Sequence, residues 1–225
     1  MKLNPSIWIA CWLLLGCQLK EDDETDSDIP AAVGSDTGVD TTAPWPSWVV
    51  KQWVWEDEST QESATALVND YLERDIPVGA IIIDSPWATG YSTYDWDTDL
   101  YPDPQAMIDE FHAKDVRVFM WTVPGINVEE TELYEYAAER NWFMTAGPGE
   151  GPKVVEWWKG EGSLIDYFNP DAVAWWHSLV NKTLDYGIDG WKCDGLDFSA
   201  IIANYSPGLG REVERIEYSH AYYQD

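Results

Sequence analysis

The chain has 225 residues, enough for one large domain but fewer than the roughly 250 of a typical complete eight-stranded α/β barrel. It carries 41 acidic against 13 basic residues, a formal net charge of −28. This balance excludes nucleic acid as a partner, because phosphate binding requires clustered lysines and arginines. Together with 15 tryptophans, it favours a secreted protein that faces sugars.

The N-terminus is predicted to be a secretion signal. Lys2 supplies a positive charge, residues 7–15 are apolar, and Leu14-Leu15-Gly16-Cys17 resembles the lipobox of bacterial lipoproteins. We predict a signal peptide over residues 1–16 and lipidation of Cys17, with a simple cleaved signal as the alternative. The apolar run of about nine residues is shorter than the roughly 20 that span a bilayer, so the membrane would be reached only through the lipid. The expected location is the bacterial cell envelope, periplasmic or on the outer-membrane surface.

Residues 17–44 are predicted to form a disordered acidic tether. The stretch is rich in Asp, Glu, Ser, Thr and Gly, and it has too few large apolar residues to offset the entropy lost on ordering. Of the three cysteines, Cys11 would leave with the signal peptide, Cys17 would carry the lipid and Cys193 would stay alone. No disulfide is therefore expected.

Strands and helices alternate after the tether. Residues 48–55 form a β-branched and aromatic run, which predicts a strand. Ser59 and Glu62 have the spacing of a capping box, which predicts a helix that Pro77 ends. Residues 78–83 are continuously apolar, as in a strand covered on both faces of a parallel sheet. The order is that of a β-α-β unit.

The pattern continues with a helix that Asp103 caps, a strand over 116–123 and a helix over about 127–140. Residues 142–168 depart from it, and we predict a loop or hairpin over the active face. Asn169 and Pro170 then start a strong amphipathic helix that ends at Gly187. A fourth strand over 190–194 and a terminal helix over about 211–225 follow.

Four strands separated by helices predict a parallel sheet, either open and doubly wound or closed as a barrel. The segment Gly147-Pro148-Gly149-Glu150-Gly151 is no phosphate fingerprint, because it follows no clear strand-to-helix turn and contains a proline. We therefore predict an incomplete (β/α)8 TIM barrel over residues 45–225, with about four β/α units present. On this basis the chain is expected to be a truncated gene product or a fragment.

The predicted strands carry residues suited to a sugar: Trp53, Asp84, Trp121 and Asp194. Indole rings offer a flat apolar face and a donor, and carboxylates accept hydrogen bonds from hydroxyl groups. Asp194 lies at the carboxyl end of the fourth strand, where parallel barrels keep their chemistry, and is our candidate nucleophile. The alternative is an aspartate that caps the next helix. For Trp121 a place in the core is equally compatible with the sequence.

Lys192 precedes Asp194 by two residues and so points to the same face of the strand. A neighbouring cation keeps a nucleophilic carboxylate ionised, although a structural ion pair is the alternative role. We expect no cofactor and no metal: Asp95 to Asp99 imitate the start of a calcium loop, but the required glycine is Leu100 and position twelve is Ala106.

Several ordered motifs resemble glycoside hydrolase family 31. Ile81-Ile82-Ile83-Asp84, Tyr101-Pro102-Asp103-Pro104 and Val118-Phe119-Met120-Trp121 are similar to its second and third barrel units. Trp158-Lys159-Gly160, the segment from Asp166 to Pro170, and Gly190-Trp191-Lys192-Cys193-Asp194-Gly195 are similar to its excursion before the fourth unit and to its nucleophile strand. The resemblance covers roughly residues 45–225.

The resemblance implies a retaining glycosidase for α-linked sugars, of the α-glucosidase or α-xylosidase type. Asp194 would attack the anomeric carbon, and Trp53, Asp84, Trp158 and Lys192 would line the subsite for the sugar. Asp166 matches an acidic residue that recurs in the family. A retaining mechanism also needs an acid/base carboxyl about 5–5.5 Å from the nucleophile. In the family it comes from the second half of the barrel, and Asp197 is expected to shape a loop instead, so the isolated chain is expected to be catalytically poor.

Two other functions stay open at this point. One is an α-galactosidase-like retaining enzyme, because those barrels also end a strand in Lys-x-Asp. The other is a non-catalytic surface protein that binds carbohydrate. In each case the expected partner is an oligosaccharide or glycoside, and the oligomeric state is undetermined.

Overall fold

The computed structural model describes residues 45–195 and 204–225. The predicted signal peptide, the predicted tether with Cys17, and Asp197 lie outside the described residues. The elements in chain order are η1 (Ser47–Val50), β1 (Gln52–Glu56), α1 (Gln61–Leu72), β2 (Val78–Ile83), α2 (Pro104–Ala113), β3 (Arg117–Thr122), β4 (Gly125–Asn127), α3 (Thr131–Ala138), β5 (Val155–Trp157), β6 (Gly160–Leu164), α4 (Pro170–Leu184), β7 (Gly190–Cys193), β8 (Asn204–Ser206), β9 (Arg211–Val213) and α5 (Arg215–Gln224).

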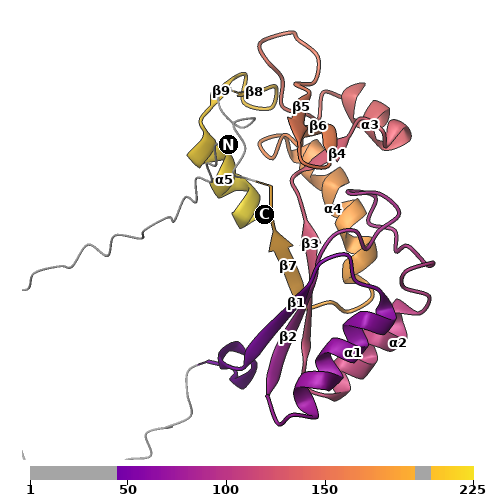
Figure 1. Ribbon diagram of the computed structural model, residues 1–225. Coiled ribbons are helices and arrows are strands. Elements are labelled where there is room, and N and C mark those ends of the chain that lie inside the picture. Colours follow the sequence, from indigo (N-terminus) through magenta and orange to yellow (C-terminus); the bar gives the residue numbers. More distant parts are fainter. Residues whose placement is uncertain (1–44, 196–203) are drawn as a thin grey trace, which may run out of the picture. The chain divides into compact units, whose positions relative to one another are not determined.

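The central element is a four-stranded parallel sheet in the order β1-β2-β3-β7 (Figure 1). Neighbouring strands follow one another along the chain with helices between them, which is the arrangement of successive barrel units. This confirms the predicted parallel α/β fold with about four units. Among the described residues, no helix is both long and apolar enough to cross a membrane.

The two faces of this sheet differ in character. One face, which we call the helical face, carries buried apolar side chains such as Val54, Ile81 and Met120, which belong to one core with residues of α1, α2 and α4. Because side chains alternate along a strand, Trp55, Trp121 and Lys192 point to the opposite side, which we call the inner face. In a barrel the inner face lines the interior.

Local hydrogen bonds explain where the predicted boundaries were wrong. Residues 47–50 form a 3-10 turn, and β1 begins only at Gln52. The capping box of α1 is made by Thr60 and Ser63. Ser59 is buried and its hydroxyl lies 2.7 Å from the hydroxyl of Tyr101, so it is not available to cap the helix.

The predicted excursion over 142–168 contains a hairpin. Strands β5 and β6 pair antiparallel, and β4 joins the other side of β6 to give a small sheet in the order β4-β6-β5. Asn127, where we expected the helix to begin, is the last residue of β4, and α3 begins later, at Thr131. The predicted terminal helix likewise starts late, at Arg215, after the β8-β9 hairpin.

Candidate functional site

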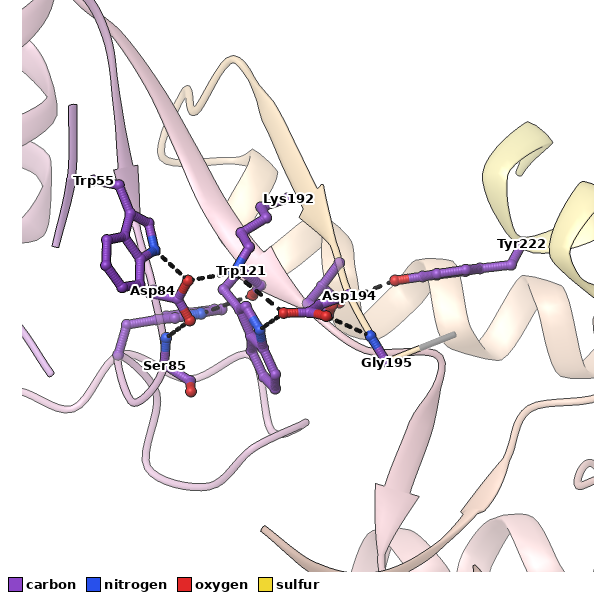
Figure 2. Close-up of polar contacts among 10 residues, drawn as sticks. Trp55, Asp84, Ser85, Trp121, Lys192, Asp194, Gly195 and Tyr222 are labelled. Atoms are coloured by element: carbon purple, nitrogen blue, oxygen red, sulfur yellow. Dashed lines mark hydrogen bonds and ion pairs between the residues drawn. The ribbon is translucent and has the colours of Figure 1, made fainter. Parts of the chain in front are cut away.

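Three charged side chains meet where β2 and β7 end. The ammonium of Lys192 lies 2.5 Å from an oxygen of Asp84 and 3.1 Å from an oxygen of Asp194 (Figure 2). Asp84 follows the last residue of β2, and Asp194 follows the last residue of β7. Lys192 and Asp194 lie on one face of β7, as the sequence predicts, and Asp84 joins them from the end of β2. We call this group the charged cluster.

Asp84 is the buried member of the charged cluster, with 5% of its surface exposed. Its two oxygens accept hydrogen bonds from the indole of Trp55, the ammonium of Lys192 and the backbone N–H of Ser85. Three donors around one carboxylate offset the cost of burying its charge. These contacts hold the Asp84 carboxylate in a fixed orientation.

Asp194 is partly open to solvent, with 30% of its side chain exposed. Its Oδ2 accepts a hydrogen bond from Nε1 of Trp121 at 2.9 Å, and its Oδ1 accepts one from the backbone N–H of Gly195 at 2.8 Å. Partial burial raises the pKa of Asp194, but these two donors and the ammonium of Lys192 outweigh it, so the pKa lies below its ordinary value. An exposed carboxylate that stays ionised is suited to act as a nucleophile.

Lys192 is the cation that the two carboxylates share. Partial burial lowers its pKa, but the hydrogen bonds and charges of Asp84 and Asp194 outweigh that effect and raise the pKa above its ordinary value. Lys192 therefore stays protonated and does not act as a base. The ion pair predicted as its alternative role is present in the structure, and it bridges the two carboxylates.

Trp121 is brought to the charged cluster but is covered by other rings. It is 2% exposed, and the indole of Trp157 from β5 stacks on it with 6.2 Å between centroids and 10° between planes. Tyr91 packs edge-on against both rings. With its face covered, Trp121 acts on Asp194 through its N–H rather than as a platform for a sugar ring.

Trp158 lies at the turn of the β5-β6 hairpin, beside Trp157, with 51% of its surface exposed. Its neighbour Trp157 donates from Nε1 to the side-chain oxygen of Asn127 at 2.7 Å, which ties β5 to the end of β4. The sequence singled out Trp158 but missed Trp157, because nothing in the order of residues reveals which of two adjacent tryptophans turns toward the sheet.

Trp53 does not join the charged cluster. It is the second residue of β1 rather than its end, and it stacks on Phe119 and packs against Trp48. Its Nε1 donates to the carbonyl oxygen of Trp48. Trp55, two residues further along the same face, is the tryptophan that contacts Asp84. The predicted strand had placed Trp53 near the end of β1, whereas β1 starts four residues later than predicted.

Asp166 is completely buried and has a structural role. Its carboxylate accepts hydrogen bonds from Oγ of Ser206 and from the backbone N–H groups of Gly208 and Phe168 at 2.8, 2.8 and 3.1 Å. Burial raises the pKa of Asp166, and the three donors oppose that shift. The residue fixes the turn between β8 and β9 to the segment that precedes α4.

We expect the substitution Asp166→Ala to destabilise the fold by about 1–3 kcal/mol, because it leaves buried donors without an acceptor. Urea unfolding followed by circular dichroism measures the change. The matched control is Asp70→Ala in α1, whose ion pair with Arg74 is exposed on both sides and is expected to contribute no more than about 0.5 kcal/mol. Equal stability of the two variants would contradict a structural role for Asp166.

The fold and the charged cluster together define a barrel-type α/β domain with its polar residues at the carboxyl ends of parallel strands, which is where such domains place their active sites. The chain belongs to glycoside hydrolase family 31. The family model "Glycosyl hydrolases family 31 TIM-barrel domain" matches residues 42–222. The family resemblance in the motifs is thereby confirmed.

Curated relatives include several glycosidases. The chain is 25% identical over 191 residues to the α-xylosidase XylQ of Lactiplantibacillus pentosus, covering 80% of this chain and 24% of that protein. It is 26% identical over 180 residues to a 1,3-α-isomaltosidase of Kribbella flavida, covering 67% of this chain and 25% of that protein. The chain therefore spans about a quarter of the length of these two relatives.

Solved structures share the fold. A dextranase of Flavobacterium johnsoniae in complex with isomaltotriose superposes with a TM-score of 0.68 at 18% identity, covering 78% of this chain and 23% of that one. An α-xylosidase from a soil metagenome in complex with xylose gives a TM-score of 0.67 at 23% identity, covering 80% of this chain and 28% of that one. At these identities the likeness establishes the fold alone.

Proposed function

We propose that the chain carries the nucleophile half of a retaining glycosidase site for α-linked sugars, with Asp194 as the nucleophile. The observation that carries this proposal is the position, exposure and ionisation of the Asp194 carboxylate. It lies at the carboxyl end of a barrel strand, is partly exposed, and is held ionised by Lys192, Trp121 and Gly195. Asp84 and Lys192 would bind hydroxyl groups of the sugar.

The reaction requires one bond to form and one to break at the anomeric carbon. An oxygen of Asp194 forms a bond to that carbon while the bond to the leaving oxygen breaks, and the leaving oxygen takes a proton from a general acid. Water then attacks the same carbon while it gives a proton to the conjugate base of that acid, and the bond to Asp194 breaks to release the carboxylate. Within the described residues, Asp84 is the other carboxylate of the cluster, and both of its oxygens already accept hydrogen bonds from Trp55, Lys192 and Ser85, so we do not assign it as the general acid.

The aromatic residues favour a pyranose as substrate. The exposed indole of Trp55 is 53% accessible and lies beside Asp84, and Trp158 projects from the β5-β6 hairpin on the side of Trp121 and Trp157. We propose α-glucosides or α-xylosides. Among the relatives are proteins named α-xylosidase, α-glucosidase and 1,3-α-isomaltosidase, which supports this range.

An activated fluoroglycoside tests the nucleophile without requiring the general acid, because its leaving group departs unaided. The full chain is incubated with the α-glucosyl, α-xylosyl and α-galactosyl forms, digested, and mapped by mass spectrometry. We expect one glycosyl group on Asp194 with the glucosyl or xylosyl reagent. A label on another residue would overturn the assignment. Sugar binding without any label would favour a non-catalytic carbohydrate-binding protein, and labelling by the galactosyl form alone would favour the α-galactosidase type.

We also propose that Cys17 is lipidated after removal of residues 1–16, which would place the protein in the bacterial cell envelope. The motif Leu14-Leu15-Gly16-Cys17 after a short apolar run supports this. We expect the chain expressed in a bacterial host to partition into detergent and to incorporate labelled palmitate, and the variant Cys17→Ala to do neither. Cys193→Ala is the matched control and is expected to retain the lipid. A soluble product of the unaltered chain would contradict lipidation.

A further inference from the structure

The two oxygens of the Asp194 carboxylate have different hydrogen-bond partners (Figure 2). Oδ2 contacts two donors, Nε1 of Trp121 at 2.9 Å and the ammonium of Lys192 at 3.1 Å. Oδ1 contacts one donor among the described residues, the backbone N–H of Gly195 at 2.8 Å. An ionised carboxylate has about four lone-pair sites, shared equally between its oxygens. Both sites of Oδ2 are therefore occupied, whereas the described residues leave one site of Oδ1 free.

Asp84 has the same kinds of donor in the same arrangement. Its Oδ2 accepts from the indole of Trp55 and from Lys192, and its Oδ1 accepts from the backbone N–H of Ser85. The two acids differ in exposure, because 7% of the Asp84 side chain is exposed against 30% of the Asp194 side chain. Asp194 is therefore the acid that a substrate can reach, and its donors decide which of its oxygens is available.

The two donors on Oδ2 are fixed by the sheet. Trp121 and Lys192 are paired in the register of β3 with β7. Trp121 is 2% exposed, and its backbone carbonyl oxygen accepts a hydrogen bond from Nε1 of Trp87 at 2.9 Å. Rotation of the Asp194 carboxylate would break the contacts with both donors. The carboxylate is thus held in one orientation, with Oδ2 toward the paired strands.

We propose that Oδ1 of Asp194 is the oxygen that attacks, and that Trp121 is a positioning residue that holds Oδ2 as the carbonyl oxygen of the glycosyl ester. This inference rests on the proposed function of Asp194 as the nucleophile. A lone pair of Oδ1 forms the bond to the anomeric carbon, and the electron pair of the breaking bond departs with the leaving group. Oδ2 then carries the C=O bond of the ester, still in contact with Trp121 and Lys192.

The donors on Oδ2 affect the two steps of the reaction in opposite directions. Negative charge leaves the carboxylate when the ester forms, and the charge returns when the ester is broken. Groups that stabilise the charged carboxylate therefore make Asp194 a weaker nucleophile but a better leaving group. Partial burial raises the pKa of Asp194, and the donors outweigh burial and lower the pKa. The main effect of Trp121 is accordingly on release of the sugar.

The variant Trp121→Phe tests this role, because it keeps an aromatic ring and removes the N–H. The full chain is labelled with an activated α-glucosyl or α-xylosyl fluoroglycoside, freed of reagent and treated with azide, a nucleophile that needs no general base. Intact mass follows the loss of label. We expect release to be about tenfold slower than in the unaltered chain, and labelling at neutral pH to change less than about threefold. The acidic limit of labelling is expected to move to higher pH.

Trp176→Phe is the matched control. Trp176 is also a buried indole, 4% exposed, but it lies on α4 and packs edge-on against Tyr94 on the helical side of the sheet. We expect this variant to change neither the rate of release nor the acidic limit of labelling. Thermal unfolding checks that both variants are folded. Equal slowing in the two variants, or unchanged release in folded Trp121→Phe, would refute the role of Trp121.

A crystal structure of the labelled, unaltered chain tests the choice of oxygen without any variant. We expect the glycosyl group on the oxygen that faces the backbone N–H of Gly195, with Nε1 of Trp121 within hydrogen-bond distance of the other oxygen. A glycosyl group on the oxygen that Trp121 contacts would overturn this inference and leave Asp194 as the nucleophile. Absence of label on Asp194 in the unaltered chain would instead show that the proposed function itself fails.

Discussion

Replacing Asp194 with asparagine is expected to slow covalent labelling by an activated fluoroglycoside by roughly 10³-fold or more, because the amide cannot attack the anomeric carbon. Trp121 and Gly195 donate to different oxygens of Asp194, and the single amide oxygen can accept only one of these hydrogen bonds, so we expect a small loss of stability with the fold kept and with little change in the affinity for sugar. Mass spectrometry measures the label, and titration calorimetry with isomaltose or xylose measures binding. Loss of binding together with labelling would point to a structural role instead.

The pH dependence of this labelling follows from the same contacts. Asp194 attacks in its ionised form, and its pKa is held below the ordinary value of 3.8. The rate is therefore expected to stay constant from neutral pH down to that value and to fall only under more acidic conditions. Asp166→Ala is the control, because the Asp166 carboxylate is bound by Ser206, Gly208 and Phe168 rather than by the charged cluster, and its loss is expected to leave the profile of the folded protein unchanged. A profile that falls well above pH 4 would contradict the proposed state of Asp194.

The substitution Lys192→Met is the second change with a large expected effect. It leaves Asp84 and Asp194 without the cation between them, and Asp84 is 5% exposed. We expect the free energy of unfolding to fall by about 1–3 kcal/mol, between the values for exposed and fully buried pairs, because Lys192 itself is partly exposed. We also expect the pKa of Asp194 to rise, which moves the acidic limit of labelling to higher pH.

The stability lost in Lys192→Met is expected to depend on pH. Since the pKa of Asp194 is lowered on folding, its contribution is present above the ordinary aspartate pKa and is lost as pH falls through the folded value. Urea unfolding measures the difference in the free energy of unfolding between Lys192→Met and the unaltered chain. We expect this difference to be largest at neutral pH and to shrink below about pH 4.

Two further variants check the origin of the effect. Asp84→Asn combined with Lys192→Met removes the stranded charge, so we expect it to recover part of the lost stability. Lys182→Met breaks an ion pair that is exposed on both sides, and is expected to cost less than about 1 kcal/mol. If Lys192→Met destabilises no more than Lys182→Met, the charged cluster is not the stabilising unit described above.

The order of parallel strands could be predicted because each was marked by a continuous or periodic apolar run with clear limits. Residues 78–83 match β2, and the predicted caps Asp103 and Asn169 do cap α2 and α4. The predicted end of α4 at Gly187 is three residues too late, because the helix ends at Leu184, and Gly187 lies in the turn that follows with a positive φ of 88°. These features depend on neighbours along the chain, which the sequence makes visible.

The aromatic part of the site could not be predicted in the same way. Trp53 and Trp55 have the same chemistry and the same strand face, and the register of β1 against β2, which pairs Trp53 with Ala80 and Trp55 with Ile82, places Trp55 beside Asp84. Trp157 contacts Trp121 across 36 positions of the chain through the pairing of β5 with β6 and of β6 with β4. Contacts of this kind are set by tertiary packing, which local propensity does not report.

The charges of the site come from the strands of the sheet, whereas the indole that covers Trp121 comes from the β5-β6 hairpin. On the proposed function, mutations that change the length or the side chains of the hairpin would alter which glycan binds. The pairing of Lys192 with Asp84 and Asp194 would be preserved. The selectivity for a glycan and the reactivity of Asp194 would therefore depend on different segments of the domain and could change independently in evolution.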